Sequence, residues 1–326
     1  MKSYNKRSEP LVIKNETITF KTFATDFYTP MSEYVEYRKA HGFTLTHGYL
    51  IRMNGIVQNR LIPQFGNKHL DEITTAEIER WFLSLSCSSK TKNAYLSALH
   101  TILKWAYKKG KVLEVATSAV SRTKNVKTYE RGIYTKEEIN TILSYTWKTE
   151  EYKIMCMLSV STGMRLGEVL GLHIEDVGQD FIKVEHSWNN STDGIKTPKS
   201  GKPRTVPLSS KVSILLQKYS KNRTSGLVFA SGVEDLPNIQ KDFRKAFIKM
   251  LETIIKDYKN RHLGFHSFRH YFNTSLVANG ISGELIRAVI GHETESMTDN
   301  YLHIRETDLN GVRRVQETVL EKISGE

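Results

Sequence analysis

Residues 265–276 read FHSFRHYFNTSL and combine an apolar repeat with a polar beginning. From position 268 every fourth residue is apolar, which is the period of a helix face that packs into a core. These apolar residues are Phe268, Phe272 and Leu276. His266 and Arg269 stand in the first turn. The stretch therefore predicts a helix with a buried apolar face and a polar opening.

The same stretch holds one pair of residues at metal-ligand spacing. His266 and His270 are four residues apart, as two zinc ligands on one helix face would be. The sequence supplies no third ligand with its own spacing and no HExxH motif. We therefore expect no metal site and no cofactor.

The composition indicates more than one domain and an anionic partner. The 326 residues are 39% hydrophobic, enough material for about two packed cores. We find no apolar run of membrane-spanning length and no secretory signal, and Cys87 and Cys156 form no paired motif, so we expect a cytoplasmic protein. The net charge of +12 favours a polyanionic partner.

Much of the positive charge lies in one segment. Residues 90–127 hold nine basic residues against the single acidic residue Glu114. The basic residues are Lys90, Lys92, Lys104, Lys108, Lys109, Lys111, Arg122, Lys124 and Lys127. A solvated helix face normally mixes both signs, so one-signed charge at this density favours binding to a nucleic-acid backbone.

Apolar periodicity divides the chain into four segments. Residues 1–19 form a polar tail, residues 20–120 are helical, residues 121–132 form a linker, and residues 133–326 form a second domain.

Local signals place several helix boundaries. Thr74 with Glu77, and Thr135 with Glu138, predict a capping box at two helix starts. Residues 90–109 predict an amphipathic helix that ends at the following glycine.

The second domain is expected to be mostly helical with a little β-structure. Helices are predicted at residues 209–220, 238–256, 266–278 and 283–290. FIKV at 181–184 and TVPL at 205–208 have strand character, and the segment between them is rich in turn formers. The expected fold class is mainly α with a small antiparallel β-sheet (α+β).

Three further pieces carry reactive residue types. STGMRLGEVLGL, residues 161–172, places Arg165 in a turn and Glu168 three residues later. KTPKSGKPRTVPL, residues 196–208, is a lysine-rich hairpin. GHETESMTDNYLH, residues 291–303, places a tyrosine nine residues after a histidine.

Together these residue types can cleave a phosphodiester. Two arginines can hold the non-bridging oxygens and neutralise the charge of a pentavalent transition state without a metal ion. Histidines can donate hydrogen bonds or accept a proton near neutral pH. A lysine can protonate the departing 5′ oxygen, while a tyrosine hydroxyl attacks phosphorus and conserves the bond as a phosphotyrosine ester.

At these residues the sequence resembles the tyrosine recombinase (phage integrase) family. TGMRLGE, HSFRH, and GH followed nine residues later by Tyr match its catalytic pattern, and residues 20–120, with IPQFGNKHLDEIT at 62–74, are similar to its core-binding (SAM-like) domain. The resemblance implies a two-domain C-shaped DNA clamp with residues 133–326 as the catalytic domain. Because only residues 1–19 precede the clamp, we expect the arm-site-binding domain of many phage integrases to be absent or vestigial.

The resemblance assigns roles on the phosphate side of the site. Arg165 and Arg269 clamp the phosphate, and Glu168 supports Arg165. His266 assists as base or donor, whereas His270 is structural because the family pattern needs only the first histidine and the arginine of HxxRH.

It also assigns the residues of strand transfer. Tyr301 is the nucleophile, His292 contacts the scissile phosphate, and Gly291 lets backbone approach closely. Lys199 is the general acid. The alternates for that role are Lys196 and Lys202.

The implied activity is strand exchange between two specific DNA sites through a covalent 3′-phosphotyrosyl intermediate and a Holliday junction, in integration or excision of a mobile element. The implied partners are double-stranded recombination sites, a homotetramer on two duplexes, and an accessory directionality factor or DNA-bending protein. The implied location is cytoplasmic and nucleoid-associated. A type IB-like topoisomerase and a non-catalytic DNA-binding regulator are the alternatives.

The carboxy-terminal segment LNGVRRVQETVLEKI, residues 309–323, carries an apolar stripe. The stripe consists of Val312, Val315, Val319 and Ile323. Such a stripe commonly folds back on its own domain, but in this family a terminal segment often docks on a neighbouring protomer. We expect docking in trans.

Overall fold

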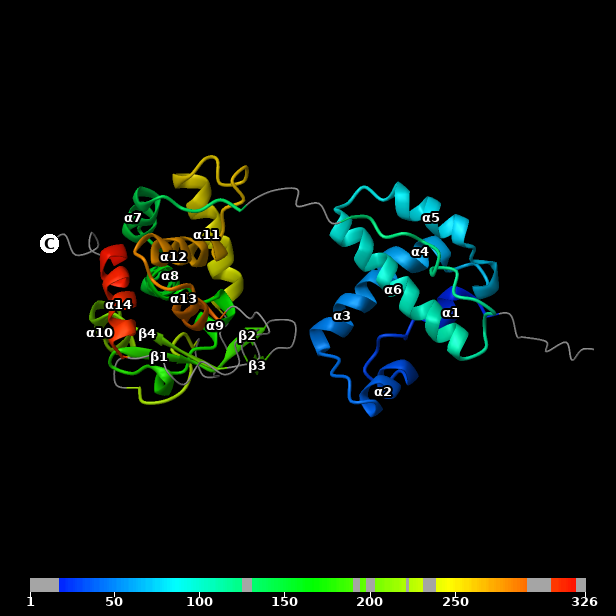
Figure 1. The fold of residues 1–326 in the computed structure, drawn as a ribbon, viewed down its shortest axis with the longest axis horizontal. Helices are drawn as coiled ribbons and strands as arrows, with labels where there is room; N and C mark the ends of the chain where they lie inside the picture. Colours follow the sequence, from blue (N-terminus) through cyan, green and yellow to red (C-terminus); the bar gives the residue numbers. More distant parts are fainter. Residues whose placement is uncertain are drawn as a thin grey trace, which may run out of the picture. The chain divides into compact units, whose positions relative to one another are not determined.

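The chain folds into two units, each with its own hydrophobic core (Figure 1). Unit 1 is Met1–Thr128 and unit 2 is Tyr129–Glu326. The computed structural model describes residues 18–124, 131–189, 194–197, 203–220, 223–230, 239–291 and 306–320. Its mainly helical structure with small antiparallel sheets confirms the expected fold class.

Unit 1 is built from helices. They are α1 (Phe20–Ala24), α2 (Glu33–Ala40), α3 (His47–Ile56), the π-helix η1 (Val57–Leu61), α4 (Ile62–Phe65), the 3-10 turn η2 (Leu70–Glu72), α5 (Thr75–Ser84) and α6 (Ser89–Lys108). The predicted amphipathic helix is α6, whose Leu99, Ile102 and Ala106 are buried. Gly110 follows it with a φ of +66°, the left-handed conformation that ends many helices.

One of the two predicted capping boxes is present. Thr135 accepts a hydrogen bond from the Glu138 N–H (3.2 Å), and its own N–H donates to the Glu138 carboxylate (2.9 Å). The box predicted at Thr74 is wrong: Thr74 caps α5, but the Glu77 carboxylate binds Lys68 at 3.0 Å instead. An ion-pair partner from outside the helix therefore replaces the return hydrogen bond.

Unit 2 surrounds one buried helix with other helices and two small sheets (Figure 1). The elements are α7 (Lys136–Ser144), α8 (Glu150–Thr162), α9 (Leu166–Leu170), the 3-10 turn η3 (Ile174–Asp176), β1 (Phe181–Val184), β2 (Ser187–Asn189), β3 (Gly194–Lys196), β4 (Arg204–Pro207), α10 (Ser210–Ser220), α11 (Ile239–Ile254), α12 (His266–Ala278), α13 (Gly283–Ile290) and α14 (Glu306–Leu320). Residues 154–162 of α8 are buried on every side, and α8 packs against α7, α9, α10, α12 and α14. Because residues 154–162 are buried all round, α8 forms the centre of the unit.

The two predicted strands pair as expected. β1 and β4 are antiparallel, with Phe181 opposite Pro207 and Val184 opposite Arg204. The second strand begins one residue earlier than predicted, at Arg204.

A second hairpin was not predicted. β2 and β3 pair antiparallel, with Trp188 opposite Ile195. β2 lies directly on α9: a Cβ added to Gly167 would be 2.8 Å from the Trp188 carbonyl oxygen, and one added to Gly171 would be 2.9 Å from the Trp188 nitrogen. Strands of three residues give little periodic signal, and this close backbone packing holds them in place.

The carboxy-terminal helix packs on its own unit. In α14, Val312, Val315 and Val319 are buried in the core of unit 2. The buried Gln316 donates from Nε2 to the Pro207 carbonyl oxygen of β4 at 2.6 Å. The expectation of docking in trans is therefore wrong for the described part of this segment, because its stripe completes the core in cis; Ile323 lies outside the described residues.

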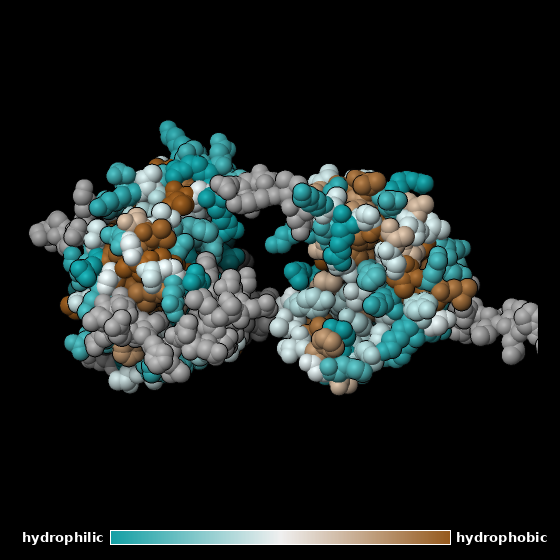
Figure 2. Space-filling model, viewed as in Figure 1, coloured by the Kyte–Doolittle hydropathy of each residue, from teal (hydrophilic) through white to brown (hydrophobic). Residues whose placement is uncertain are grey.

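The surface is mixed, and both cysteines are free. Figure 2 shows hydrophilic residues over much of the visible face, with hydrophobic residues in smaller groups on both units. Cys87 is exposed and Cys156 is buried. Among the residues described, no helix combines the length and apolarity needed to cross a membrane.

Candidate active site

Arg165 lies in the tight turn between α8 and α9. α8 ends at Gly163, whose φ is +67°, and a Cβ there would lie 2.9 Å from the Phe272 ring of α12. Arg165 then caps α9: its N–H donates to Glu168 Oε2 (2.9 Å) and its Nη1 to Oε1 (2.8 Å). Its side chain is 23% exposed. The turn therefore fixes the guanidinium while leaving it open to solvent.

Glu168 is buried between two arginines. Besides the Arg165 contacts, its Oε2 accepts from Arg204 Nη2 at 2.7 Å and its Oε1 from Arg204 Nη1 at 3.2 Å. Burial alone would raise the pKa of this carboxyl, but the hydrogen bonds and charge of Arg204, joined by those of Arg165, hold the pKa below its ordinary value. Glu168 therefore stays ionised and orients both arginines.

Arg204 joins this cluster although the sequence analysis did not single it out. It is the first residue of β4, its side chain is 3% exposed, and its Nε also donates to the Val289 carbonyl oxygen of α13 at 2.9 Å. A usable signal exists in the strand alternation, because Arg204 shares a face with the apolar Val206 and Leu208. A charged residue on a buried face requires a buried partner.

Arg269 is held in the core by backbone carbonyls. In the first turn of α12, its Nη1 donates to the Gly163 oxygen at 2.8 Å and its Nη2 to the Ile290 oxygen. Its Nε is buried without a partner among the described residues. Burial, and then the nearby charge of Arg165, lowers the pKa of Arg269 to about 9. The site therefore gathers positive charge that an anion would stabilise.

His266 is neutral in this surrounding. Burial lowers its pKa to about 4, with further lowering by His270, Arg131, Arg269 and Arg165 in that order. The His266 and His270 rings meet edge to face at 5.0 Å. A neutral imidazole has one ring nitrogen that donates a hydrogen bond and one that accepts a hydrogen bond.

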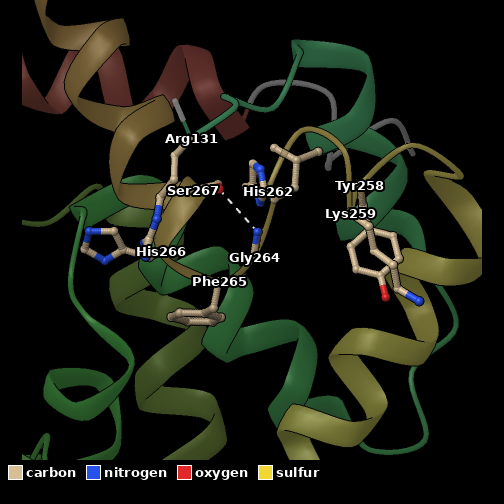
Figure 3. A pocket seen from close by; sticks show the side chains of 9 residues that line it. Arg131, Tyr258, Lys259, His262, Gly264, Phe265, His266 and Ser267 are labelled. Carbon is tan, nitrogen blue, oxygen red and sulfur yellow. Dashed lines mark hydrogen bonds between the residues drawn. The ribbon is translucent and has the colours of Figure 1, made fainter. Parts of the chain in front are cut away.

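A pocket opens beside His266 (Figure 3). Its volume is about 440 Å³. Figure 3 shows His266 and Arg131 at one side and Tyr258 and Lys259 at the other. The loop between them is fixed by the Gly264 N–H, which donates to Ser267 Oγ at 3.2 Å. His266 therefore lies at the edge of this pocket.

Gly291 ends α13 against Arg204. Its φ is +70°, and a Cβ there would lie 3.0 Å from the Arg204 Cδ. The Gly291 backbone therefore packs closely against the Arg204 side chain. Both the conformation and the space require glycine.

Several expected site residues cannot be compared with this geometry. Lys127, Lys199, Lys202, His292 and Tyr301 lie outside the described residues. The backbone of the alternate Lys196 ends β3 and pairs with Ser187.

The basic segment of unit 1 does not form one patch. Eight of its nine residues are described: Lys90, Lys92, Lys104, Lys108, Lys109, Lys111, Arg122 and Lys124. Lys90 and Lys108 lie 18 positions apart on α6, about 27 Å along the axis. At the far end Lys109 pairs with Glu33, and Lys108 lies 3.5 Å from the Tyr37 ring centre.

The chain after α6 folds back onto that helix. Asn93 donates to the Thr123 oxygen at 2.7 Å and accepts from its N–H at 3.1 Å. Lys104 and Arg122 both act on the pKa of His100, which burial lowers first. Arg122 therefore lies near the middle of α6, apart from the group at its end.

Family models match both units. The model described as "Phage integrase family" matches residues 133–308. The model described as "Phage integrase, N-terminal SAM-like domain" matches residues 27–86.

Two curated relatives illustrate the range of similar proteins. Transposase B from transposon Tn554 of Staphylococcus aureus is 28% identical over 197 residues, which are 56% of this chain and 29% of the transposase. Tyrosine recombinase XerD of Staphylococcus saprophyticus is 25% identical over 257 residues, which are 74% of this chain and 82% of XerD. The chain thus matches less than a third of the transposase but most of XerD.

Solved structures share the fold. The Tn1549 transposon integrase in complex with a circular intermediate DNA has a TM-score of 0.63 at 19% identity, over 93% of this chain and 99% of that one. A lambda integrase tetramer bound to a Holliday junction has a TM-score of 0.63 at 15% identity, over 93% of this chain and 86% of that one.

Proposed function

The chain belongs to the phage integrase family, and on that premise we propose that it is a site-specific DNA recombinase. It cleaves and rejoins DNA through a covalent 3′-phosphotyrosyl intermediate and exchanges strands through a Holliday junction. Its biological task is the integration or excision of a mobile element. The similarity to a transposon transposase and to XerD supports this proposal.

The proposed reaction is a transesterification. The Tyr301 hydroxyl attacks the scissile phosphorus, the bond from phosphorus to the 5′ oxygen breaks, and a phosphotyrosine ester forms at the 3′ end. Lys199 gives a proton to the departing 5′ oxygen, and His266 accepts the tyrosine proton or donates to the phosphate. His292 contacts the same phosphate. The reverse reaction, with the 5′ hydroxyl of another strand, rejoins the DNA.

One observation carries the proposal: three guanidinium groups gather around one carboxylate. Arg165 and Arg204 share Glu168, and Arg269 is close enough for both Arg165 and Glu168 to act on its pKa. The cluster is therefore deficient in negative charge. A phosphodiester brings one negative charge and its pentavalent transition state a second, so the cluster favours the transition state.

This charge distribution supports a mechanism without metal or ATP. The arginines neutralise the growing charge, which a divalent ion does in many other phosphoryl-transfer sites. The phosphotyrosine ester stores the energy of the broken bond, so rejoining needs no nucleotide. We therefore assign no cofactor to the reaction.

The proposed substrate is double-stranded DNA carrying specific sites. The solved relatives include an integrase with a circular intermediate DNA and a tetramer on a Holliday junction, which supports a homotetramer on two duplexes here. An accessory directionality factor or DNA-bending protein would set the direction. Because its substrate is the DNA of the cell, we propose a cytoplasmic, nucleoid-associated protein.

We propose that DNA phosphates bind to unit 1 at its exposed basic residues. These are the ones that make no ion pair in the described structure. They include Lys90, Lys104, Arg122 and Lys124. Lys109 contributes less, because it already pairs with Glu33.

The test is covalent trapping on a suicide duplex. Duplexes from the flanks of the encoding element, each carrying a nick or a phosphorothiolate, are incubated with the protein in EDTA. We expect a denaturant-resistant adduct on the 3′ side of the break that is lost in Tyr301→Phe and kept in Tyr107→Phe, whose exposed tyrosine lies in unit 1.

Binding without an adduct would contradict the proposal and favour a regulator. Plasmid relaxation without recombination would favour a topoisomerase.

A further inference from the structure

Three potential metal ligands meet outside the proposed active site. His173 precedes η3, Asp176 ends it, and His186 precedes β2. Each offers one ligand atom, and these atoms all lie within 4.8 Å of one another. The three residues are separated by three and ten positions, which matches no zinc motif, so the sequence carries no signal for this cluster.

The cluster has nearly the dimensions of a tetrahedral site. Asp176 Oδ2 lies 3.3 Å from His186 Nδ1 and 3.9 Å from His173 Nδ1. Ligand atoms at zinc distances in tetrahedral geometry are roughly 3.3–3.5 Å apart. Small side-chain rotations would therefore bring one nitrogen of each imidazole and one carboxylate oxygen around a common centre.

One atom of the cluster is buried without a partner. His173 Nδ1 has no hydrogen bond in the described structure, and 3.9 Å is too long for one to Asp176. A buried polar atom without a partner is costly, and coordination to a bound ion removes that cost. The His186 side chain is 36% exposed. An ion can therefore enter from solvent.

We propose that His173, Asp176 and His186 bind one divalent ion of the zinc class. Two neutral imidazoles and a carboxylate suit borderline ions such as Zn²⁺ and Co²⁺ better than Mg²⁺ or Ca²⁺, which prefer oxygen ligands. Three protein ligands leave a fourth position for water.

The ion ties together two segments that bear on the active site. η3 follows α9, which carries Glu168, and β2 lies on α9 through Gly167 and Gly171. His186 lies directly before β2, in the hairpin that ends at Lys196. The ion fixes the base of this hairpin to η3, which follows α9, and takes no part in strand cleavage. Neither the metal site nor this tie rests on the proposed recombinase function.

The first test measures zinc binding by the full chain in the absence of DNA. A negative result would therefore overturn the metal site without bearing on the proposed recombination. Chelator-treated protein is titrated with ZnCl₂ by calorimetry near neutral pH. We expect one ion per chain. His186→Asn and His173→Gln should each weaken binding by more than the roughly 10–100-fold lost when an outer partner of a ligand is removed.

The matched control is His270→Asn, since His266 and His270 are the other close histidine pair in the described structure. It should leave the affinity unchanged. Absence of binding to wild-type protein, unchanged affinity in His186→Asn, or loss in His270→Asn alone would each overturn the proposal. Circular dichroism checks that the variants are folded.

Hydrogen exchange tests the tie to the hairpin. Zn²⁺ should slow exchange of the backbone amides in β2 and β3 of wild-type protein and leave them unchanged in His186→Asn. Zinc binding without this protection would overturn the claim that the ion fixes the hairpin.

Discussion

Replacing Arg204 with methionine should destabilise unit 2, because the buried carboxylate of Glu168 loses one of its two charged partners. Arg204 donates two hydrogen bonds to Glu168 and one to the Val289 oxygen. In Arg204→Met, Glu168 keeps only the two contacts from Arg165. Removing one partner of a buried ion pair costs about 3–5 kcal/mol. For a unit of this length the cost corresponds to a fall in Tm of roughly 6–20 °C.

The assay is urea unfolding followed by hydrogen exchange of α8 amides, which report on the centre of unit 2 alone. The control Arg313→Met removes the partner of the half-exposed Asp180 and should cost about 0–1 kcal/mol. Combining Arg204→Met with Glu168→Met removes both charges, so the double variant should be less destabilised than the sum of the single variants. A loss below about 1 kcal/mol in Arg204→Met, or strict additivity in the double variant, would refute the reasoning.

The pH dependence of stability, the end of α13 and DNA binding can each be tested separately. Because the folded state lowers the pKa of His266 from 6.5 to about 4, its contribution to stability is complete above pH 6.5 and decreases as the pH falls towards 4. His266→Asn should flatten this loss in melts across that range, and an unchanged loss would contradict this cause. Gly291→Ala should lower the free energy of unfolding by at least about 1 kcal/mol, because φ is positive there and the new Cβ would meet Arg204. The control Gly280→Ala has a similar φ but open space around it, so it should lower the free energy of unfolding by less in the same urea assay. DNA affinity should fall steeply between about 50 and 200 mM salt in filter binding, and a flat response would contradict a basic DNA-binding surface.

The sequence was informative wherever one element carries its own pattern. α12 and α13 lie where the apolar period places them, and β1 pairs with β4 because each strand is bounded by turn formers. The pairing of Arg165 with Glu168 follows from their spacing of three residues at a helix start. These features need only local information.

The features that the sequence does not reveal depend on contacts between distant segments. The Glu168 carboxylate binds Arg204 across 36 positions, and neither residue alone indicates that pairing. The apolar spacing of the Val312 stripe is the same whether the helix packs in cis or in trans. The space available in the core of unit 2 decides which packing occurs, and the sequence pattern does not show that space. Asp176 and His186 likewise meet through the packing of β2 on α9.

The burial of α14 in unit 2 sets an order of events during synthesis. Val312, Val315 and Leu320 belong to the same core as α8, so that core stays incomplete until these residues have left the ribosome. Domains generally fold as units in the order in which they are translated. Unit 1 can therefore fold while unit 2 is still being made. The core around the arginine cluster is therefore completed last, after the residues of α14 have been made.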